Sequence, residues 1–348
     1  MSLRTQKVVT FGEVMLRLSP PGAMRFQQAT SFDAVYGGGE ANVAVSLANF
    51  GLATDFVSRV PDNPIGLSCK RLLRQYGVGV QHVLIGGRRM GIYFLEKGAS
   101  SRPSQVIYDR VGSAFSCIRP SMVDWDSVFE GCTWFHWTGV TPAVSKGAAE
   151  TCLCGIREAS ARGVTISCDL NFRRKLWNWG RRAAEVMPEM VELCDVLIGN
   201  EEDSAETLGI HAEGTNVASG VLEAESYRDV CAQVSSRFPG LRTIAVTLRG
   251  SLSASHNTWS AVLWSDGKLR TARDYNIEQI VDRVGGGDSF AAGLIYGAIA
   301  YPKSEQQMLD FATAASCLKH TIAGDFNLVT VAEVENLLAG DGSGRISR

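Results

Sequence analysis

Short apolar segments that alternate with amphipathic segments constrain the fold of this chain more than any other feature. The first four are a strand at 7–18, a helix at 40–50, a strand at 52–59 and a helix at 63–76. The rhythm resumes near residue 133 and ends with three helices between residues 288 and 339. Strands alternating with helices in this way are typical of a mostly parallel sheet covered by helices. The sequence therefore predicts an α/β fold.

Two stretches interrupt this rhythm. Residues 88–117 contain two alternating runs, at 91–96 and 105–110, separated by Gly, Ser and Pro. This pattern is typical of a β-hairpin. Together with residues 14–36, it predicts a small antiparallel sheet that projects from the main body. We expect one domain over residues 1–340 and a disordered tail at 341–348.

Composition excludes several classes of protein. No stretch is as long and apolar as a membrane-spanning helix, and the first residues lack the apolar core of a secretion signal. The net charge of −2 offers no electrostatic footprint for nucleic acid. The nine cysteines lack the paired spacing of a zinc site, so we expect reduced thiols in a cytoplasmic protein. From the charge and the absence of a spanning segment, we expect no nucleic-acid or membrane partner.

The glycine run 285–287 is the strongest chemical signal, because it leads directly into Asp288 and an apolar helix. Glycines allow backbone amides to point toward a ligand, and a helix start adds partial positive charge, so an anion is expected there. Asp288 either caps the helix or serves as a general base beside a phosphoryl group. The chain contains no GxxxxGK[ST] and no GxGxxG after its first strand, which excludes a P-loop protein and disfavours an oxidoreductase.

Five motifs, in order along residues 8–338, resemble the ribokinase/PfkB carbohydrate kinase family. They are Gly37-Gly-Gly-Glu-Ala-Asn-Val-Ala, Asp169-Leu-Asn-Phe-Arg, Asn200-Glu-Glu-Asp, Val246-Thr-Leu-Arg-Gly and Asp282-Arg-Val-Gly-Gly-Gly-Asp. The resemblance implies a three-layer α/β/α ribokinase-like domain with a β-sheet lid. It also implies ATP and Mg²⁺, and transfer of the γ-phosphoryl group to a sugar-like hydroxyl.

Within this family, three stretches are most similar to the 2-keto-3-deoxygluconate kinases. They begin at Tyr108-Asp-Arg-Val-Gly, Asn171-Phe-Arg-Arg-Lys and Lys319-His-Thr-Ile-Ala. The resemblance implies phosphorylation of 2-keto-3-deoxygluconate to its 6-phosphate. Such a substrate presents a carboxylate, to which Arg110 and Arg173 can donate charge-assisted hydrogen bonds. Two alternatives stay open: a kinase for a neutral sugar such as fructose or ribose, and a non-catalytic sugar-acid-binding protein of the same fold.

The resemblance also implies roles for individual residues. Asp288 matches the general base, and Gly285, Gly286 and Gly287 match the anion hole. The implied substrate contacts are Gly38, Tyr93, Tyr108, Arg110, Arg173 and Asp325. The implied ATP-site residues are Asn200, Thr247, Gly250, Gly285 and Gly287, and Glu202 is implied near Mg²⁺ through a water. Paired lid sheets in the family imply a homodimer, with Ile92, Phe94, Val106 and Ile107 at its interface.

The chain departs from the family pattern at four positions. Val284 and Gly286 stand where the family commonly has Thr and Ala, Arg249 stands at a family glycine, and Asp203 ends a motif that usually ends in Glu. A structural role is the alternative for several candidates. An arginine pair at 173–174 is by default solvated, although the position after a buried strand favours a pocket for Arg173.

Overall fold

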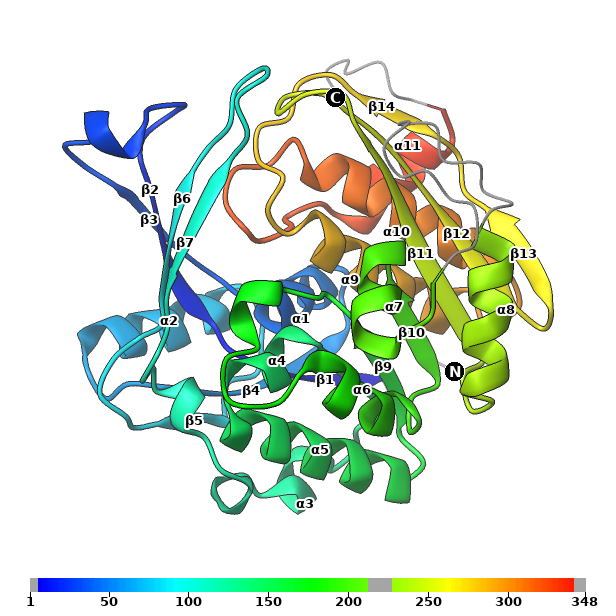
Figure 1. Cartoon of the computed structure of the whole chain (residues 1–348), viewed down its shortest axis with the longest axis horizontal. Coiled ribbons are helices and arrows are strands. Elements are labelled where there is room, and N and C mark those ends of the chain that lie inside the picture. The colour runs from blue at the N-terminus through cyan, green and yellow to red at the C-terminus, as the bar shows by residue number, and fades with distance from the viewer. Residues whose placement is uncertain (1–5, 212–226, 341–348) are drawn as a thin grey trace.

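A mixed sheet is the middle layer of the structure, a computed structural model that describes residues 6–211 and 227–340 (Figure 1). Within these residues it has ten strands, in the order β13-β12-β11-β10-β9-β8-β1-β4-β5, with β14 paired to β12. From β11 to β5 the strands are parallel, whereas β12, β13 and β14 pair antiparallel. Their bounds are β1 Lys7–Phe11, β4 Ala53–Val60, β5 Val83–Ile85, β8 Trp134–Thr138, β9 Thr165–Asp169, β10 Val196–Gly199, β11 Thr243–Ser251, β12 Asn257–Ser265, β13 Lys268–Thr271 and β14 Tyr275–Ile277.

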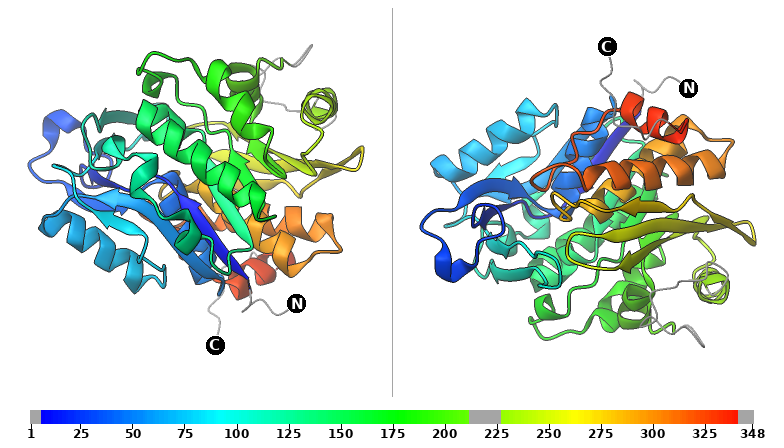
Figure 2. Two further views of the ribbon diagram at one scale, coloured as in Figure 1. Left: turned by 90° about the horizontal axis from the view of Figure 1, so that it is seen from below. Right: turned by 90° about the horizontal axis from the view of Figure 1, so that it is seen from above.

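Helices cover both faces of this sheet (Figure 2). Successive strand residues point to opposite faces, so Val8 packs in one core with α1, α9, α10 and α11, and Val9 packs in another with α5, α6, α7 and α8. This arrangement confirms the predicted three-layer α/β/α fold. The helices are α1 Gly39–Asn49, α2 Pro64–Gln75, α3 Trp125–Val128, α4 Val140–Val144, α5 Lys146–Ala161, α6 Ala183–Val191, α7 Glu201–Leu208, α8 Tyr227–Arg237, α9 Gly286–Ala300, α10 Glu305–Lys319 and α11 Val331–Leu338, with short 3-10 turns at Phe26–Gln28, Phe115–Cys117, Pro120–Met122 and Arg174–Leu176.

A separate small sheet stands to one side of the main sheet (Figure 1). It contains β2 (Met15–Ser19), β3 (Asp33–Gly37), β6 (Ile92–Glu96) and β7 (Gln105–Asp109), in the order β3-β2-β6-β7. The outer pairs are antiparallel as expected, but the central pair β2–β6 is parallel. The reason is that β2 follows β1 and β6 follows β5, and β1 and β5 run in the same direction in the main sheet.

The predicted helix at 144–162 corresponds to α5, which runs from Lys146 to Ala161, and a short helix that was not predicted, α4, precedes it. Helix α4 ends at Val144, and Ser145 then caps α5 by accepting a hydrogen bond from the amide of Ala148 at 3.1 Å. Serine is a preferred N-cap, which explains why a new helix begins there. The predicted tail at 341–348 lies outside the described residues. In the described part of the chain, no helix has both the length and the apolar character needed to cross a bilayer.

Candidate active site

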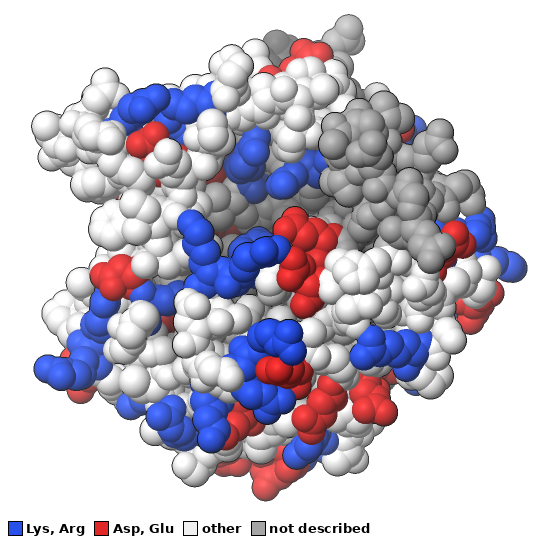
Figure 3. Space-filling view, viewed as in Figure 1, with Lys and Arg blue, Asp and Glu red and all other residues white. Residues whose placement is uncertain are grey.

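A cleft of about 690 Å³ opens where the small sheet faces the carboxyl ends of β9, β10 and β11. Ligands of open α/β sheets commonly bind at this edge. Figure 3 shows basic side chains around the hollow at the centre of this face. All but one of the predicted site residues line the cleft: Gly38, Tyr93, Tyr108, Arg110, Arg173, Asn200, Glu202, Thr247, Gly285, Gly286, Gly287, Asp288 and Asp325. The exception, Gly250, is buried in β11 opposite Thr258 of β12.

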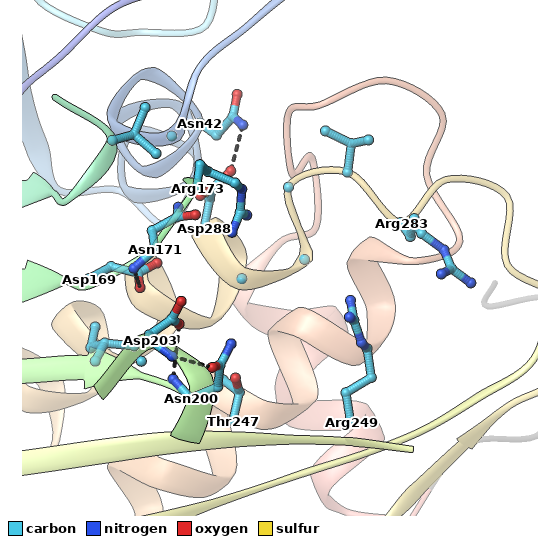
Figure 4. A pocket seen from close by; sticks show the side chains of 18 of the residues that line it. Asn42, Asp169, Asn171, Arg173, Asn200, Asp203, Thr247, Arg249, Arg283 and Asp288 are labelled. Carbon is cyan, nitrogen blue, oxygen red and sulfur yellow. Dashed lines mark hydrogen bonds between the residues drawn. The ribbon is translucent and has the colours of Figure 1, made fainter. Parts of the chain in front are cut away.

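Asp288 lies in the first turn of α9, inside the cleft. Its Oδ2 accepts a hydrogen bond of 2.6 Å from the side-chain amide of Asn42 in α1 (Figure 4). Burial raises the pKa of Asp288 to about 6, although the Asn42 hydrogen bond opposes this shift. A carboxylate with such a pKa is ionised at neutral pH and is basic enough to accept a proton from a substrate.

The glycine run forms the start of α9. Gly285 has φ +83°, in the left-handed region that favours glycine. A Cβ at this position would lie 2.1 Å from the carbonyl oxygen of Asp325, so a larger residue does not fit. Gly287 is exposed, and a Cβ there would have no heavy atom within 4 Å. Because the first amides of a helix lack intrahelical partners, this end of α9 is suited to bind an anion.

Arg110 reaches the cleft from the end of the small sheet. Its Nε donates a hydrogen bond of 2.8 Å to Glu13, which also accepts one of 2.6 Å from the hydroxyl of Ser113. The residue is 6% exposed, yet its Nη1 has no partner among the described residues. A buried guanidinium nitrogen without a partner is costly. Nη1 of Arg110 is therefore available to donate a hydrogen bond to an acceptor that enters the cleft.

Tyr93 and Asp325 join the small sheet to the C-terminal part of the chain. The hydroxyl of Tyr93 donates a hydrogen bond to Oδ2 of Asp325. The two residues are 5% and 3% exposed, and both line the cleft. Burial raises the pKa of Asp325, while Arg17 opposes that shift.

The motif at 200–203 serves mainly to start α7. Asn200 caps the helix by accepting a hydrogen bond from the amide of Asp203 at 2.9 Å, and Asp203 accepts one from the amide of Asn200 at 3.1 Å. Asp203 also accepts a hydrogen bond of 2.8 Å from the amide of Phe172. The shorter acid at 203 thus ties the β10–α7 turn to the loop after β9.

Three further residues of the cleft are arginines, and Figure 4 shows Arg173 beside Asp288, whereas Arg249 and Arg283 lie apart from it. Arg173, Arg249 and Arg283 form no ion pair with a carboxylate among the described residues. Burial and the guanidinium groups of Arg283 and Arg173 lower the pKa of Arg249, so the three positive charges repel one another. Figure 4 shows the Arg249 and Arg283 side chains in the space beside the glycine run. Such a group of like charges is stabilised when an anion binds between them.

Arg174, the next residue in the chain after Arg173, has different surroundings. Arg174 does not line the cleft and instead forms an exposed ion pair with Glu206 in α7.

Sequence reasoning left several polar residues of the cleft unassigned, and three of them lie near Asp288. These are Asn42, Asp169 and Asn171. Asn171 has φ +36° and a buried Oδ1 without a partner in the described part of the chain. Burial, and the nearby carboxylates of Asp203 and Asp288, raise the pKa of Asp169. All three stand in motifs of the family resemblance, Asn42 in the motif at 37–44 and the other two in the motif at 169–173, so motif membership was the available signal.

The residues of the cleft are compatible with a metal carried by a phosphate ligand. In the described ranges, no group of three or more His, Cys, Asp or Glu side chains is arranged to hold a metal ion. Mg²⁺ usually keeps several waters and binds one or two carboxylates together with substrate phosphates. Glu202 is exposed and lines the cleft, which suits this mode of binding.

Comparison with known proteins identifies close relatives of the chain. The model of the pfkB family of carbohydrate kinases matches residues 5–327. A 2-dehydro-3-deoxygalactonokinase of Haloferax volcanii is 32% identical over 98% of this chain and 99% of its own length. A 2-dehydro-3-deoxygluconokinase of Bacillus subtilis is 28% identical over 84% of this chain and 82% of its own length.

Solved structures give the same result. The crystal structure of a 2-dehydro-3-deoxygluconokinase from Thermotoga maritima superposes with a TM-score of 0.91 and is 45% identical, covering 96% of this chain and 100% of that one. A fructokinase from Xylella fastidiosa with bound ATP superposes with a TM-score of 0.78 at 22% identity, over 96% of this chain and 98% of that one. The second match concerns the fold alone.

Proposed function

Because the chain belongs to the pfkB family of carbohydrate kinases, we propose that it transfers the terminal phosphoryl group of ATP to 2-keto-3-deoxygluconate, which its relatives' names call 2-dehydro-3-deoxygluconate. The product is the 6-phosphate. One observation carries the choice of a sugar acid over a neutral sugar: the unpartnered Nη1 of buried Arg110 lies in the same cleft as Asp288. A substrate carboxylate is the natural partner for this nitrogen.

In the proposed reaction, Asp288 accepts the proton of the acceptor hydroxyl. The amides at the start of α9 stabilise negative charge on the transferring phosphoryl group. Thr247, Asn200, Arg249 and Arg283 lie along the cleft beyond the glycine run, where the remaining phosphates and the nucleoside fit. Mg²⁺, when bound with ATP, neutralises charge on the phosphates, and Glu202 would hold it through a water.

The small sheet is the proposed lid of a kinase domain that spans residues 1–340. Of the two segments that form this lid, 88–117 contributes Tyr93, Tyr108 and Arg110 to the cleft, and 14–36 contributes Met15. Closure of such a lid excludes water, which limits the hydrolysis of ATP. Tyr108 is 37% exposed, which leaves it free to contact a substrate on closure.

The acids in the names of the relatives are epimers, since one relative is a galactonokinase and others are gluconokinases. An ADP-release assay of the purified chain should therefore compare 2-keto-3-deoxygluconate, its galacto epimer, fructose and ribose. We expect turnover with one or both acids and at least ~10-fold lower kcat/KM with the neutral sugars. Preference for fructose or ribose would favour a neutral-sugar kinase, and no turnover with any acceptor would favour a binding protein.

An Arg110→Met variant tests whether Arg110 binds the substrate carboxylate. One charge-assisted bond contributes about 1.5–3 kcal/mol, so we expect kcat/KM for the keto acid to fall about 10–100-fold, with a much smaller change for a neutral sugar. Arg89→Met is the matched control, because Arg89 pairs with Asp109 at 2.6 Å beside the same strand but does not line the cleft. Equal losses for acid and neutral substrates would remove the carboxylate role of Arg110.

We also propose a cytoplasmic homodimer. None of the nine cysteines forms a disulfide, which is usual for a reducing compartment. Register places Ile107 opposite Phe94 and Val106 opposite Leu95. Val106 therefore shares the cleft-facing side of the small sheet, so the dimer interface would use Ile92, Phe94 and Ile107 on the other face.

A further inference from the structure

Arg17 is an arginine inside the molecule at the junction of the small sheet and the loop that begins α9. Its side chain and those of Asp282 and Asp325 are each 2% exposed. Nη2 donates to Asp282 at 2.6 Å, Nη1 donates to Asp325 at 2.8 Å, and Nε donates to Ser19 at 2.9 Å. One guanidinium thus joins a strand of the small sheet to two separate segments of the main domain.

Both aspartates that Arg17 binds lie next to the glycine run, Asp282 through its carboxylate and Asp325 through its backbone carbonyl. Asp282 accepts a hydrogen bond from the amide of Val284 at 3.2 Å and another from the amide of Gly324 at 3.2 Å. Asp325 contacts Gly285 through its backbone, where even a Cβ would lie 2.1 Å from the carbonyl oxygen. Displacement of either aspartate would therefore move the amides at the start of α9.

Arg17 also belongs to the row of side chains that faces the cleft. Strand register places Arg17 opposite Tyr93, and Tyr93 opposite Tyr108. Tyr93 and Arg17 bind different oxygens of the same Asp325 carboxylate. Arg17 itself does not line the cleft, so it can act on a ligand only through its partners.

We infer that Arg17 is a positioning residue for phosphoryl transfer: by bridging Asp282 and Asp325, it holds the small sheet, the substrate-facing Asp325 and the anion-binding amides in one geometry. The inference rests on the proposed function of the cleft. A planar guanidinium can bind two carboxylates in fixed directions, whereas an ammonium is a point charge. Lys97, 3.5 Å from Asp282, and buried Lys319 supply further positive charge but leave this two-armed bridge to Arg17.

The main test compares Arg17→Lys with a matched control, Arg102→Lys. Arg102 pairs with Glu96 at 2.8 Å inside the small-sheet segments and does not reach the glycine run. A misplacement of about 1 Å at a reacting centre costs roughly 10²-fold in rate. We expect kcat of Arg17→Lys to fall about 10–100-fold while KM for ATP changes less than about threefold, and kcat of Arg102→Lys to stay within about twofold of the wild type. Wild-type kcat in Arg17→Lys, or an equal loss in the control, would overturn the inference.

Hydrogen exchange gives a readout that requires no turnover. In Arg17→Lys, we expect the amides of residues 282–288 to exchange at least about fivefold faster than in the wild type, with no such change in Arg102→Lys. If these amides exchanged at the wild-type rate in Arg17→Lys, the positioning role of Arg17 would be overturned, whatever substrate the chain phosphorylates. Conversely, faster exchange in a chain inactive on every acceptor would support the role of Arg17 and contradict the proposed function.

A double-mutant cycle separates coupling from general destabilisation. Asp282→Asn removes one carboxylate of the bridge without removing side-chain volume. Because both changes break one contact, the Arg17→Lys/Asp282→Asn variant should lose little more kcat than the worse single variant. Losses that multiply would mean that the two residues act independently, which contradicts the bridge.

Discussion

At the scale of single residues, the cleft combines groups whose surroundings prepare them for a ligand. Arg110 is fixed by Glu13 but keeps one buried nitrogen without a partner. Asp288 is basic for a carboxylate because burial outweighs the hydrogen bond from Asn42. Both arrangements reduce the stability of the empty protein and are useful only when a ligand completes them.

Asp288→Asn tests the assignment of the base. An amide cannot accept the hydroxyl proton, and general base catalysis contributes about 10²–10⁴-fold, so we expect kcat to fall at least ~10²-fold. ATP affinity should change little, because the amides of the glycine run remain. The measurements are steady-state kinetics and calorimetric titration with ATP. Turnover close to that of the wild type would contradict the role of Asp288.

The raised pKa of Asp288 predicts how kcat/KM and the free energy of unfolding of the wild type and of Asp288→Asn depend on pH. The pKa of Asp288 is raised from 3.8 to about 6 in the folded chain, so kcat/KM should fall tenfold per pH unit below about 6, as the base becomes protonated. The unfolded chain releases this proton near pH 4, so ionisation of Asp288 lowers the free energy of unfolding as pH rises from about 4 to 6. Asp288→Asn should therefore be more stable than the wild type at pH 8 by up to about 3 kcal/mol, with the difference lost near pH 4. Equal stabilities at pH 8 would contradict the raised pKa.

At the scale of elements, the start of α9 and the small sheet form two walls of one site. The helix contributes its first amides, and the strands contribute a row of polar side chains on one face. Neither wall is a site without the other. The glycines at the helix start differ in backbone conformation and in the space around them. A pair of alanine variants at Gly285 and Gly287 therefore tests both properties.

Gly285→Ala and Gly287→Ala should have opposite effects on stability. At Gly285 the φ of +83° and the 2.1 Å approach of Asp325 both oppose a methyl group, so we expect a loss of about 3 kcal/mol in the free energy of unfolding. At Gly287 a methyl group has open space and favours the helix, so stability should stay equal or rise by about 0.5 kcal/mol. That methyl group enters the cleft, however, and should lower kcat/KM for ATP about tenfold. Thermal unfolding and the ADP-release assay measure both effects, and a destabilised Gly287→Ala would contradict this account.

At the scale of the whole molecule, the proposed dimer depends on apolar residues that the single chain leaves uncovered. All five residues of β7 are exposed, and Ile107 is 53% exposed on the face away from the cleft. Exposed apolar residues gathered in this way are common at protein interfaces. The proposed interface would place a second copy against the small sheet rather than against the main sheet.

Ile107→Glu tests the dimer by light scattering. A charge at the centre of an apolar interface costs several kcal/mol when it is buried without a partner, so the variant should be a monomer at a concentration where the wild type is a dimer. Leu252→Glu is the control, because Leu252 is 64% exposed and lies outside the small sheet. A monomeric wild type, or loss of the dimer in the control, would contradict an interface through the small sheet.

Local sequence patterns were sufficient for the layers of the fold, and they suggested the proposed centre of the site. Strand and helix periods are properties of short segments, so they predicted the α/β layers and most element positions. The glycine run and Asp288 adjoin in the sequence, so the prediction of an anion site there needed no distant residue, and the structure brings all four residues to one cleft. The short helix α4 was missed because its five residues are too few to show a helical period.

The connections between distant segments were decided by the tertiary structure alone. Arg17 and Asp325 are 308 positions apart, and no pattern along the chain pairs them. The same holds for Glu13 with Arg110, for Asn42 with Asp288, and for the parallel pairing of β2 with β6. Burial, partner geometry and pKa depend on every atom that surrounds a group, whereas a sequence pattern describes only its neighbours along the chain.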